Sequence, residues 1–511
     1  MILQSSNNKR IAQNTIFLYI RMLLIMSVTL YTSRVILNTL GIEDYGIYGV
    51  VGGVVTMLSF LNASLSGASS RFITFAMGKG DKKHIQEVFS TVLCIHFLMM
   101  GFIILLGETV GLWFVYNKLV IPPERMTAAL WVYHCSIFTA AISIISIPYN
   151  SLIISHERMG VFAYISIIEV LLKLIIVWVL IYIPQDKLIV YALLYLFVQL
   201  LIRIMYNYYC TTHFVESRTK AVWNISLMKQ MSSYAGWTMN GNLAVIGYTQ
   251  GLNILLNIFF GPAVNAARNI SVQVQTAVFT FIQNFQMAVK PQIIKSYAIS
   301  DLSYMHTLIV ALSKYGFFLI LLLAFPLMIC VNPILKQWLG IVPEHTANFV
   351  CIMLFTGMLN SLGSALIIAI HATGDIKKFQ LYEGTSLLTV VPIAYILVKF
   401  LHISPEIVML VYLLVEAFTM CIRIWIVLPK ISMKFSFYLQ RVLLPIFPLI
   451  PCFIIPVYFI SIPDNISWIN LLIWITGSAL YISLCIIIMG MNILERKKIY
   501  GFFIKKLYSL K

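Results

Sequence analysis

Apolar runs long enough to cross a lipid bilayer recur along almost the whole chain of 511 residues, and they constrain its fold more than any other feature. A membrane-spanning helix needs about 20 predominantly apolar residues. By that length the sequence predicts fourteen spans, at residues 11–37, 45–66, 87–115, 126–150, 161–183, 188–210, 234–258, 266–290, 306–335, 346–371, 379–399, 406–428, 442–461 and 468–491. We therefore expect an all-α integral membrane protein.

Composition excludes the main soluble alternatives. Hydrophobic residues make up 60% of the chain and charged residues only 10%, too few to cover the surface of a soluble protein of this length. The formal charge of +17 would suit a nucleic-acid partner, but the basic residues lie in short runs between apolar spans. The eight cysteines lie far apart within apolar runs and form no CxxC pair, which favours small buried side chains over metal ligands or disulfides.

The loop charges predict the orientation of the chain in the membrane. With the N-terminus inside, 23 Lys and Arg residues fall in cytoplasmic segments and only 5 on the opposite side. Lys and Arg collect in cytoplasmic loops. We therefore expect both termini in the cytoplasm, with the basic tail from Arg496 onward lying on the inner leaflet.

Loop lengths repeat between the first six spans and the next six. Residues 41–81 and 261–301 align without gaps, with Gly41 matching Gly261 and Asp81 matching Asp301. Two such halves are typical of transporters that work around a central site by alternating access. The expected organisation is an N-terminal lobe at 1–210, a cytoplasmic linker at 211–233, a pseudo-symmetric C-terminal six-helix lobe at 234–428, and two further spans with the basic tail at 429–511.

Seven basic residues remain inside the predicted spans: Arg21, Arg34, Lys173, Arg203, Arg268, Lys314 and Arg423. A charge in the bilayer is costly, so each is expected to face a partner or a watery cavity. Lys173 follows Glu169 by four residues, and Arg423 follows Glu416 by two helical turns. These two pairs either neutralise each other structurally or couple transport to Na⁺ or H⁺; no other cofactor and no metal site is expected.

Three of these arginines are candidates for binding a substrate. Arg21 and Arg34 lie in a predicted span without any Asp or Glu, and Arg268 opens a span with a polar stripe. Amide side chains lie in the same predicted span as Arg268 and in the span before it: Gln273 in the first, and Asn253 and Asn257 in the second. Guanidinium groups match phosphate oxygens and amides match hydroxyls, which suits a ligand with phosphate or diphosphate and sugars. The alternative is that the amides only hold helices together.

The segment from Arg34 to Tyr48 carries a family resemblance in the residues R-V-I-L-N-T-L-G-I-E-D-Y-G-I-Y, as does the loop H-E-R-M at 156–159. With the doubled six-span plan, it resembles Wzx-type O-antigen flippases, polysaccharide biosynthesis proteins of the multidrug/oligosaccharidyl-lipid/polysaccharide exporter superfamily. The resemblance implies a two-lobed bundle in the bacterial inner membrane. It also implies translocation of undecaprenyl-diphosphate-linked oligosaccharide of the O-antigen, lipopolysaccharide or capsule type to the periplasmic leaflet.

Arginines in a central cationic cavity are part of what the resemblance implies, and Arg21, Arg34 and Arg268 lie in the corresponding helices. It further implies a monomer among membrane lipids that works beside the glycan polymerase machinery. A cation-coupled multidrug antiporter is the alternative, although such exporters typically place an acidic residue in the first span. A glycan polymerase or ligase is disfavoured because no outer loop exceeds about twelve residues. No loop is long enough for a separate enzymatic domain, so we expect a transporter and not an enzyme.

Overall fold

The chain is helical throughout the part that the computed structural model describes. The described residues are 2–56, 59–118, 121–218, 224–339, 342–460, 462–463 and 466–497. They divide into two compact units. The first comprises Met1–Asn242 and Met287–Asp301, and the second comprises Leu243–Gln286 and Leu302–Lys511.

Twelve helices of the described residues are long and apolar enough to cross a membrane, so the chain is a multi-pass membrane protein. The predicted count of fourteen is not confirmed. One predicted span missing from the twelve, 45–66, includes residues 57–58 outside the described part of the chain. The other, 266–290, lies within a long helix rich in Asn, Gln and Thr. Most of the predicted tail, residues 498–511, also lies outside the described residues.

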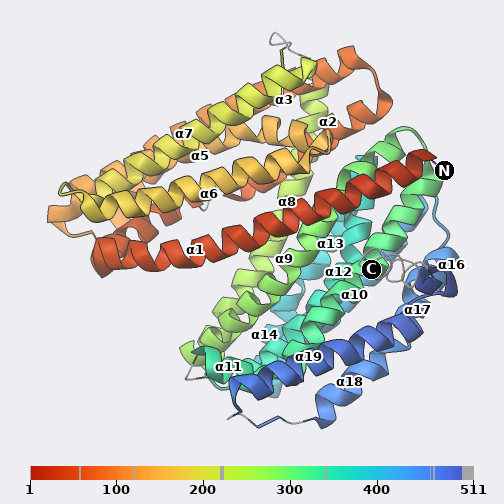
Figure 1. The fold of residues 1–511 in the computed structure, drawn as a ribbon. Coiled ribbons are helices and arrows are strands. Elements are labelled where there is room, and N and C mark those ends of the chain that lie inside the picture. The colour runs from red at the N-terminus through yellow and green to blue at the C-terminus, as the bar shows by residue number, and fades with distance from the viewer. Residues whose placement is uncertain are drawn as a thin grey trace, which may run out of the picture. The chain divides into compact units, whose positions relative to one another are not determined.

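The first unit is a bundle of long helices (Figure 1). Its helices are α1 (Ile2–Thr56), α2 (Ser59–Lys79), α3 (Lys82–Leu106), the short α4 (Leu112–Lys118), α5 (Met126–Ser155), α6 (Met159–Tyr182) and α7 (Lys187–His213). Aspartates begin two of them. Asp81 accepts hydrogen bonds from the amides of Lys83 and His84, and Asp186 accepts from those of Leu188 and Ile189, which satisfies N–H groups that have no partner within the helix.

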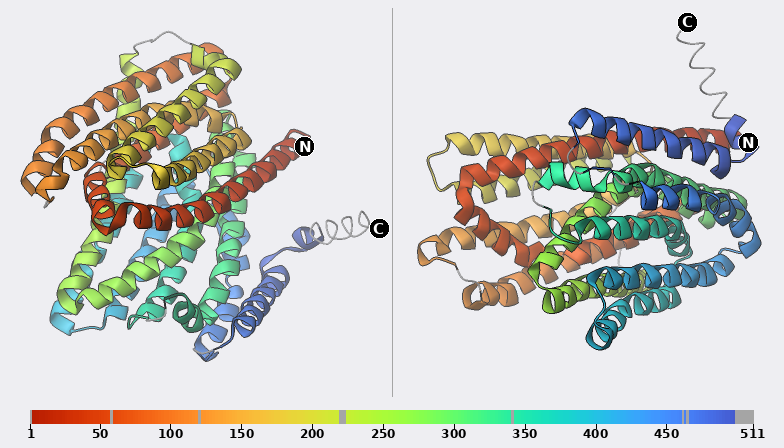
Figure 2. Two further views of the ribbon diagram at one scale, coloured as in Figure 1. Left: turned by 60° about the vertical axis from the view of Figure 1, so that its left-hand side comes forward. Right: turned by 90° about the horizontal axis from the view of Figure 1, so that it is seen from below.

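The connection between the first two predicted spans, residues 38–44, is helical. α1 continues without a break through this stretch to Thr56. Figure 2 shows the red ribbon of α1 reversing its direction at the end far from the N-terminus, so the chain turns by bending a continuous helix. The matching position in the second half behaves differently. There Gly261 adopts φ +85° and separates α8 (Ile225–Phe260) from α9 (Pro262–Ala298).

The second unit contains the middle of the chain and its C-terminal part. Beside portions of α8 and α9 it consists of α10 (Leu302–Ile329), α11 (Val331–Leu339), α12 (Thr346–Thr373), α13 (Lys377–Leu388), α14 (Val390–Leu401), α15 (Pro405–Lys430), α16 (Phe435–Tyr438), α17 (Leu444–Ile446), α18 (Leu449–Phe459) and α19 (Trp468–Cys485). Gly374 ends α12 in the left-handed conformation, with φ +81°.

Each unit has its own apolar core. In the first, Val51, Val132 and Leu188 are buried together. In the second, Leu252 and Phe349 belong to the corresponding cluster. The outer helix faces are apolar too, since side chains such as Phe197 and Leu414 are mostly exposed. Apolar exposed faces suit contact with lipid.

Candidate functional site

The first unit contains a cavity of about 400 Å³ between α1, α6 and α7. Arg21 of α1 lines it, together with Glu169 and Lys173 of α6. Ser166, Glu169 and Lys173 recur at intervals of three and four residues, so they share one face of α6. The structure thus brings one predicted substrate-binding arginine to the same cavity as one predicted ion pair.

Glu169 and Lys173 bond to each other. Lys173 Nζ donates to Glu169 Oε1 at 2.7 Å, and Gln199 Nε2 of α7 donates to the same oxygen at 2.9 Å. The ammonium of Lys173 also lies 4.7 Å from the ring centroid of Tyr195. The carboxylate therefore has two donors and the charge of Lys173 is compensated.

Arg21 has a different environment. Its Cζ lies 4.6 Å from the ring centroid of Phe162, a distance at which cation and ring attract. Its Nε is buried and has no hydrogen-bond partner among the described residues. Glu169 is the one carboxylate among the described residues that line the cavity, and Lys173 and Gln199 already bond to it. Two cations and one carboxylate leave the lining with one net positive charge.

Three tyrosines complete the cavity wall: Tyr48 from α1, and Tyr191 and Tyr195 from α7. The rings of Tyr48 and Tyr191 meet edge to face, with centroids 5.0 Å apart, and those of Tyr191 and Tyr195 are 6.1 Å apart. None of the three was predicted to line a site. Tyr191 and Tyr195 are spaced by one helical turn, but a pair of tyrosines in a span is common and carries no sign of a cavity.

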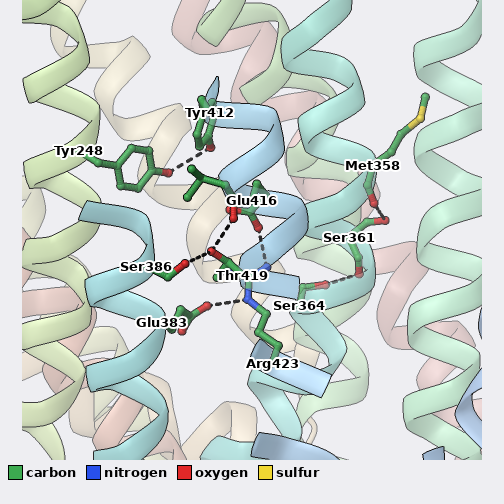
Figure 3. A network of polar contacts seen from close by, with 11 residues as sticks. Tyr248, Met358, Ser361, Ser364, Glu383, Ser386, Tyr412, Glu416, Thr419 and Arg423 are labelled. Carbon is green, nitrogen blue, oxygen red and sulfur yellow. Dashed lines mark hydrogen bonds and ion pairs between the residues drawn. The ribbon is translucent and has the colours of Figure 1, made fainter. Parts of the chain in front are cut away.

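The second unit buries a charged group of three residues (Figure 3). Arg423 Nη1 donates to Glu416 at 2.6 Å and Arg423 Nε donates to Glu383 at 2.7 Å. The three residues are 3%, 1% and 8% exposed for Arg423, Glu416 and Glu383. The predicted Glu416–Arg423 pair is therefore in contact, and Glu383 of α13 is an additional partner that was not predicted. Glu383 could have been predicted as a partner, because it is a carboxylate inside a predicted span.

Further polar contacts join α15 to α13 and to α8. Ser386 and Thr419 share a hydrogen bond of 2.8 Å, and Tyr248 and Tyr412 share one of 3.1 Å (Figure 3). Gly363 of α12 gives Arg423 its space, because a Cβ there would lie 2.5 Å from Nη1.

Arg268 of α9 is buried and donates to Asn253 of α8, so the structure joins two of the predicted substrate-binding residues. The Nε of Arg268 is buried without a hydrogen-bond partner among the described residues. Gln273 is exposed. Gln275, which was not predicted, donates to the carbonyl of Met353 at 2.9 Å.

Two predicted residues have side chains outside the described part of the structure. Arg34 lies in α1 and Asn257 in α8, but only their helical backbone is described. All eight cysteines are free, and the described residues contain no group of three His, Cys, Asp or Glu side chains that could hold a metal ion.

A buried carboxylate holds the predicted cytoplasmic end of the first unit. Glu157 accepts from Arg10 at 2.7 Å, from Lys295 at 2.6 Å and from Gln292 at 2.5 Å, and its side chain is fully buried. Beside it, His156 stacks on Phe214 with centroids 4.0 Å apart. Burial lowers the pKa of His156 to about 4, although Glu216 partly opposes this. The imidazole is therefore neutral near pH 7.

The predicted outer end of the same unit holds a second charged cluster. Arg125 donates to both oxygens of Asp44, at 2.9 and 2.6 Å, and to both oxygens of Asp186, at 2.7 and 3.2 Å. Burial raises the pKa of Asp186, but its bonds from Arg125 and from backbone amides outweigh this and hold the pKa below its usual value. Asp44 belongs to the segment that carried the family resemblance.

A comparison with known protein families gives a match over more than half of the chain. Residues 11–300 match the family model described as "Polysaccharide biosynthesis protein". No curated protein shows significant similarity to the sequence.

Solved structures share the fold over most of the chain. A MATE structure in the bent conformation superposes with a TM-score of 0.72 at 15% identity, covering 83% of this chain and 96% of that one. An outward-facing MATE family transporter of the MOP superfamily gives 0.68 at 15% identity, covering 83% and 96%. A MOP superfamily transporter from Pyrococcus furiosus, described as having a binding pocket of reversed polarity, gives 0.69 at 15% identity, covering 82% and 95%. The chain thus shares the fold of these solved structures.

Proposed function

Because the chain belongs to the polysaccharide biosynthesis protein family and has the fold of MOP superfamily transporters, we propose that it translocates a lipid-linked oligosaccharide across the membrane. The expected substrate is oligosaccharide linked to undecaprenyl diphosphate, of the O-antigen or capsule type. The expected site is the bacterial inner membrane, and the direction is from the cytoplasmic to the periplasmic leaflet.

The observation that carries this proposal is Arg21 at the cavity wall. A buried charge without a partner costs several kcal/mol, about 3–5 kcal/mol where a pair is broken. The Nε of Arg21 is buried without a hydrogen-bond partner, and Lys173 and Gln199 already bond to Glu169. A diphosphate entering the cavity would supply acceptor oxygens that match the planar guanidinium.

Translocation then follows from alternating access between the two halves. In the first half, Arg21 binds the diphosphate. The other predicted substrate-binding residues stay candidates for contacts with the diphosphate or with sugar hydroxyls: Arg34, Arg268, Asn253, Asn257 and Gln273. The polyprenyl tail stays in lipid. The protein acts as a monomer, with both termini in the cytoplasm, and delivers its product to the glycan polymerase machinery.

Replacement of Arg21 tests the proposal in cells. Arg21→Gln removes the charge, and surface glycan should fall sharply at unchanged protein level, whereas Arg21→Lys should retain part of it. Arg203→Gln is a matched control, because Arg203 also lies over an aromatic ring, 4.1 Å from the centroid of Tyr149, but outside the cavity. Normal glycan in Arg21→Gln would reject the assignment.

The alternative of a cation-coupled multidrug antiporter has less support. A cationic drug would need a free carboxylate in the cavity, and Lys173 and Gln199 bond to the carboxylate of Glu169. The net positive lining repels cations. Raised drug sensitivity with intact glycan after deletion of the gene would favour the antiporter.

The charged group around Arg423 is the better candidate for ion coupling. Two carboxylates and one guanidinium leave one buried negative charge, which either H⁺ or Na⁺ would neutralise. Dissipating one ion gradient at a time in reconstituted vesicles identifies the ion. If Glu383→Gln and Glu416→Gln both keep the wild-type response to that gradient, this group is not the coupling site.

A further inference from the structure

The cavity of the first unit has a charged part and an aromatic part. Arg21 lies over Phe162, near the start of α6, while Lys173 lies about three turns later and contacts Tyr195. Each turn advances about 5.4 Å along a helix. From Lys173 the wall continues through Tyr195 to Tyr191 and Tyr48, whose rings contact one another in that order.

Two of the tyrosines are held by the Arg125 cluster. Asp44 precedes Tyr48 by one helical turn of α1, and Asp186 caps the helix that carries Tyr191. Arg125 binds both carboxylates with paired hydrogen bonds. Paired guanidinium–carboxylate bonds fix orientation as well as distance. The cluster thus ties together the two segments from which Tyr48 and Tyr191 reach the cavity.

The lining suits a polar ligand with apolar faces. Ligand sites typically measure about 300–1,000 Å³ and combine aromatic walls with a few polar groups, and this cavity of about 400 Å³ has both. Tyrosine offers an apolar ring face and a hydroxyl. A pyranose has the complementary features, since its C–H groups form apolar faces and its hydroxyls form hydrogen bonds. A polyprenyl tail is a hydrocarbon and could not form hydrogen bonds with the polar groups.

We propose that Tyr48, Tyr191 and Tyr195 form a carbohydrate subsite for the sugar bonded directly to the diphosphate, and that Arg125 is a positioning residue that holds this subsite together through Asp44 and Asp186. The inference rests on the proposed function, because the charged part of the cavity must receive the diphosphate. The volume admits a sugar next to that diphosphate but not a whole oligosaccharide.

Binding to the purified full-length protein tests the subsite. The probes are undecaprenyl diphosphate alone and the same lipid bearing one glucose, galactose or N-acetylglucosamine. The wild type should bind at least one sugar-bearing lipid more tightly than the bare diphosphate. Tyr191→Leu and Tyr195→Leu should weaken that lipid about tenfold, or about 1.4 kcal/mol, and leave the bare diphosphate unchanged. Tyr191→Phe, which keeps the ring, should retain most of the preference.

A substitution of Arg125 tests its positioning role. Arg125→Lys keeps the charge but not the paired hydrogen bonds, so it should lose the preference for sugar and keep the affinity for bare diphosphate. A purely structural role for Arg125 would weaken both probes together. Tyr164→Leu, at an exposed tyrosine of α6 outside the cavity, serves as the control and should change neither affinity.

The outcomes separate the two proposals. If the wild type binds neither probe, or if Arg21→Gln leaves both affinities unchanged, the proposed function fails at this cavity. If the wild type binds both probes equally, or if the tyrosine variants weaken both alike, the carbohydrate subsite is overturned while the diphosphate site stands.

Discussion

Arg21 and Arg423 are both arginines within predicted spans, but their surroundings differ. Arg423 has two carboxylate partners within 2.7 Å, whereas the Nε of Arg21 is buried without a partner. Breaking a buried ion pair is more costly than forming it is favourable, because the remaining charge stays desolvated. The charge of Arg423 is therefore compensated in the folded protein, whereas Arg21 keeps a donor available for an anion, as the proposed function requires.

Substitutions in the Arg423 group should differ strongly in how much they destabilise the protein. Arg423→Met leaves two buried carboxylates side by side and should destabilise the protein by about 3–5 kcal/mol. Glu383→Gln leaves a neutral Arg423–Glu416 pair with the amide still able to accept a hydrogen bond, and should cost about 1 kcal/mol or less. Thermal unfolding in detergent measures both. Equal losses would show that the three charges do not act as a group.

His156 should make the protein sensitive to mild acid. Its pKa in the folded protein is about 4, below the usual value of about 6.5, so between these pH values the unfolded chain binds more protons. Stability should therefore fall as pH drops below about 6.5, by at most about 1 kcal/mol per pH unit once solvent screening is allowed for. His156→Phe, which keeps the stacking on Phe214, should show a smaller loss between pH 7 and 5. An unchanged loss would assign the acid sensitivity to other groups.

At residue scale the sequence predicts only what is local. The pairs Glu169–Lys173 and Glu416–Arg423 lie on single helices, and their spacing brings them into contact. Glu383 lies 40 residues before Arg423 on another helix, so its contact depends on how α13 and α15 pack. The same holds for Arg125, which lies 81 residues after Asp44.

The two halves make their first turns, which are predicted to lie outside, by different means. α1 bends without interruption, whereas α8 ends at Gly261 with φ +85° and α9 begins at Pro262. The sequence predicts a turn at both places from a glycine between apolar runs. The difference has a local signal, because Gly41 is followed by Ile42 and lacks the Gly-Pro sequence that ends the helix at Gly261.

Gly261 should be sensitive to substitution for backbone reasons alone. A Cβ there would meet nothing within 4 Å, so the cost of Gly261→Ala is the left-handed conformation, about 1–2 kcal/mol. Gly316→Ala in α10 is the matched control, since that helical glycine also has open space, and it should stabilise by about 0.5–1 kcal/mol. Unfolding measurements that show the same sign for both would contradict this account of the turn.

For the whole molecule, the sequence predicts the class of fold and the family but not the number of spans. The predicted span 266–290 is the most informative difference, because its polar residues remove α9 from the set of clearly apolar helices. Arg268 and Gln275 of this helix bond to Asn253 and to a carbonyl of α12. Polar residues that bond to neighbouring helices make a helix hard to recognise as a span.

The orientation of the chain is testable in a cysteine-free background. Gln185 and Ser432 are both exposed, and the loop charges put the first outside and the second in the cytoplasm. A membrane-impermeant maleimide added to spheroplasts should label Gln185→Cys and not Ser432→Cys. Labelling of Ser432→Cys from outside would overturn the predicted orientation.

The most direct measurement of the central claim is translocation by purified protein in proteoliposomes. The substrate is undecaprenyl-diphosphate-linked oligosaccharide, and the readout is its appearance in the opposite leaflet. Loss of a charged hydrogen bond is worth about 1.5–3 kcal/mol, so Arg21→Gln should slow translocation about tenfold or more. Arg203→Gln should stay within about twofold of the wild type. A wild-type rate in Arg21→Gln would contradict the assignment of this cavity to the diphosphate.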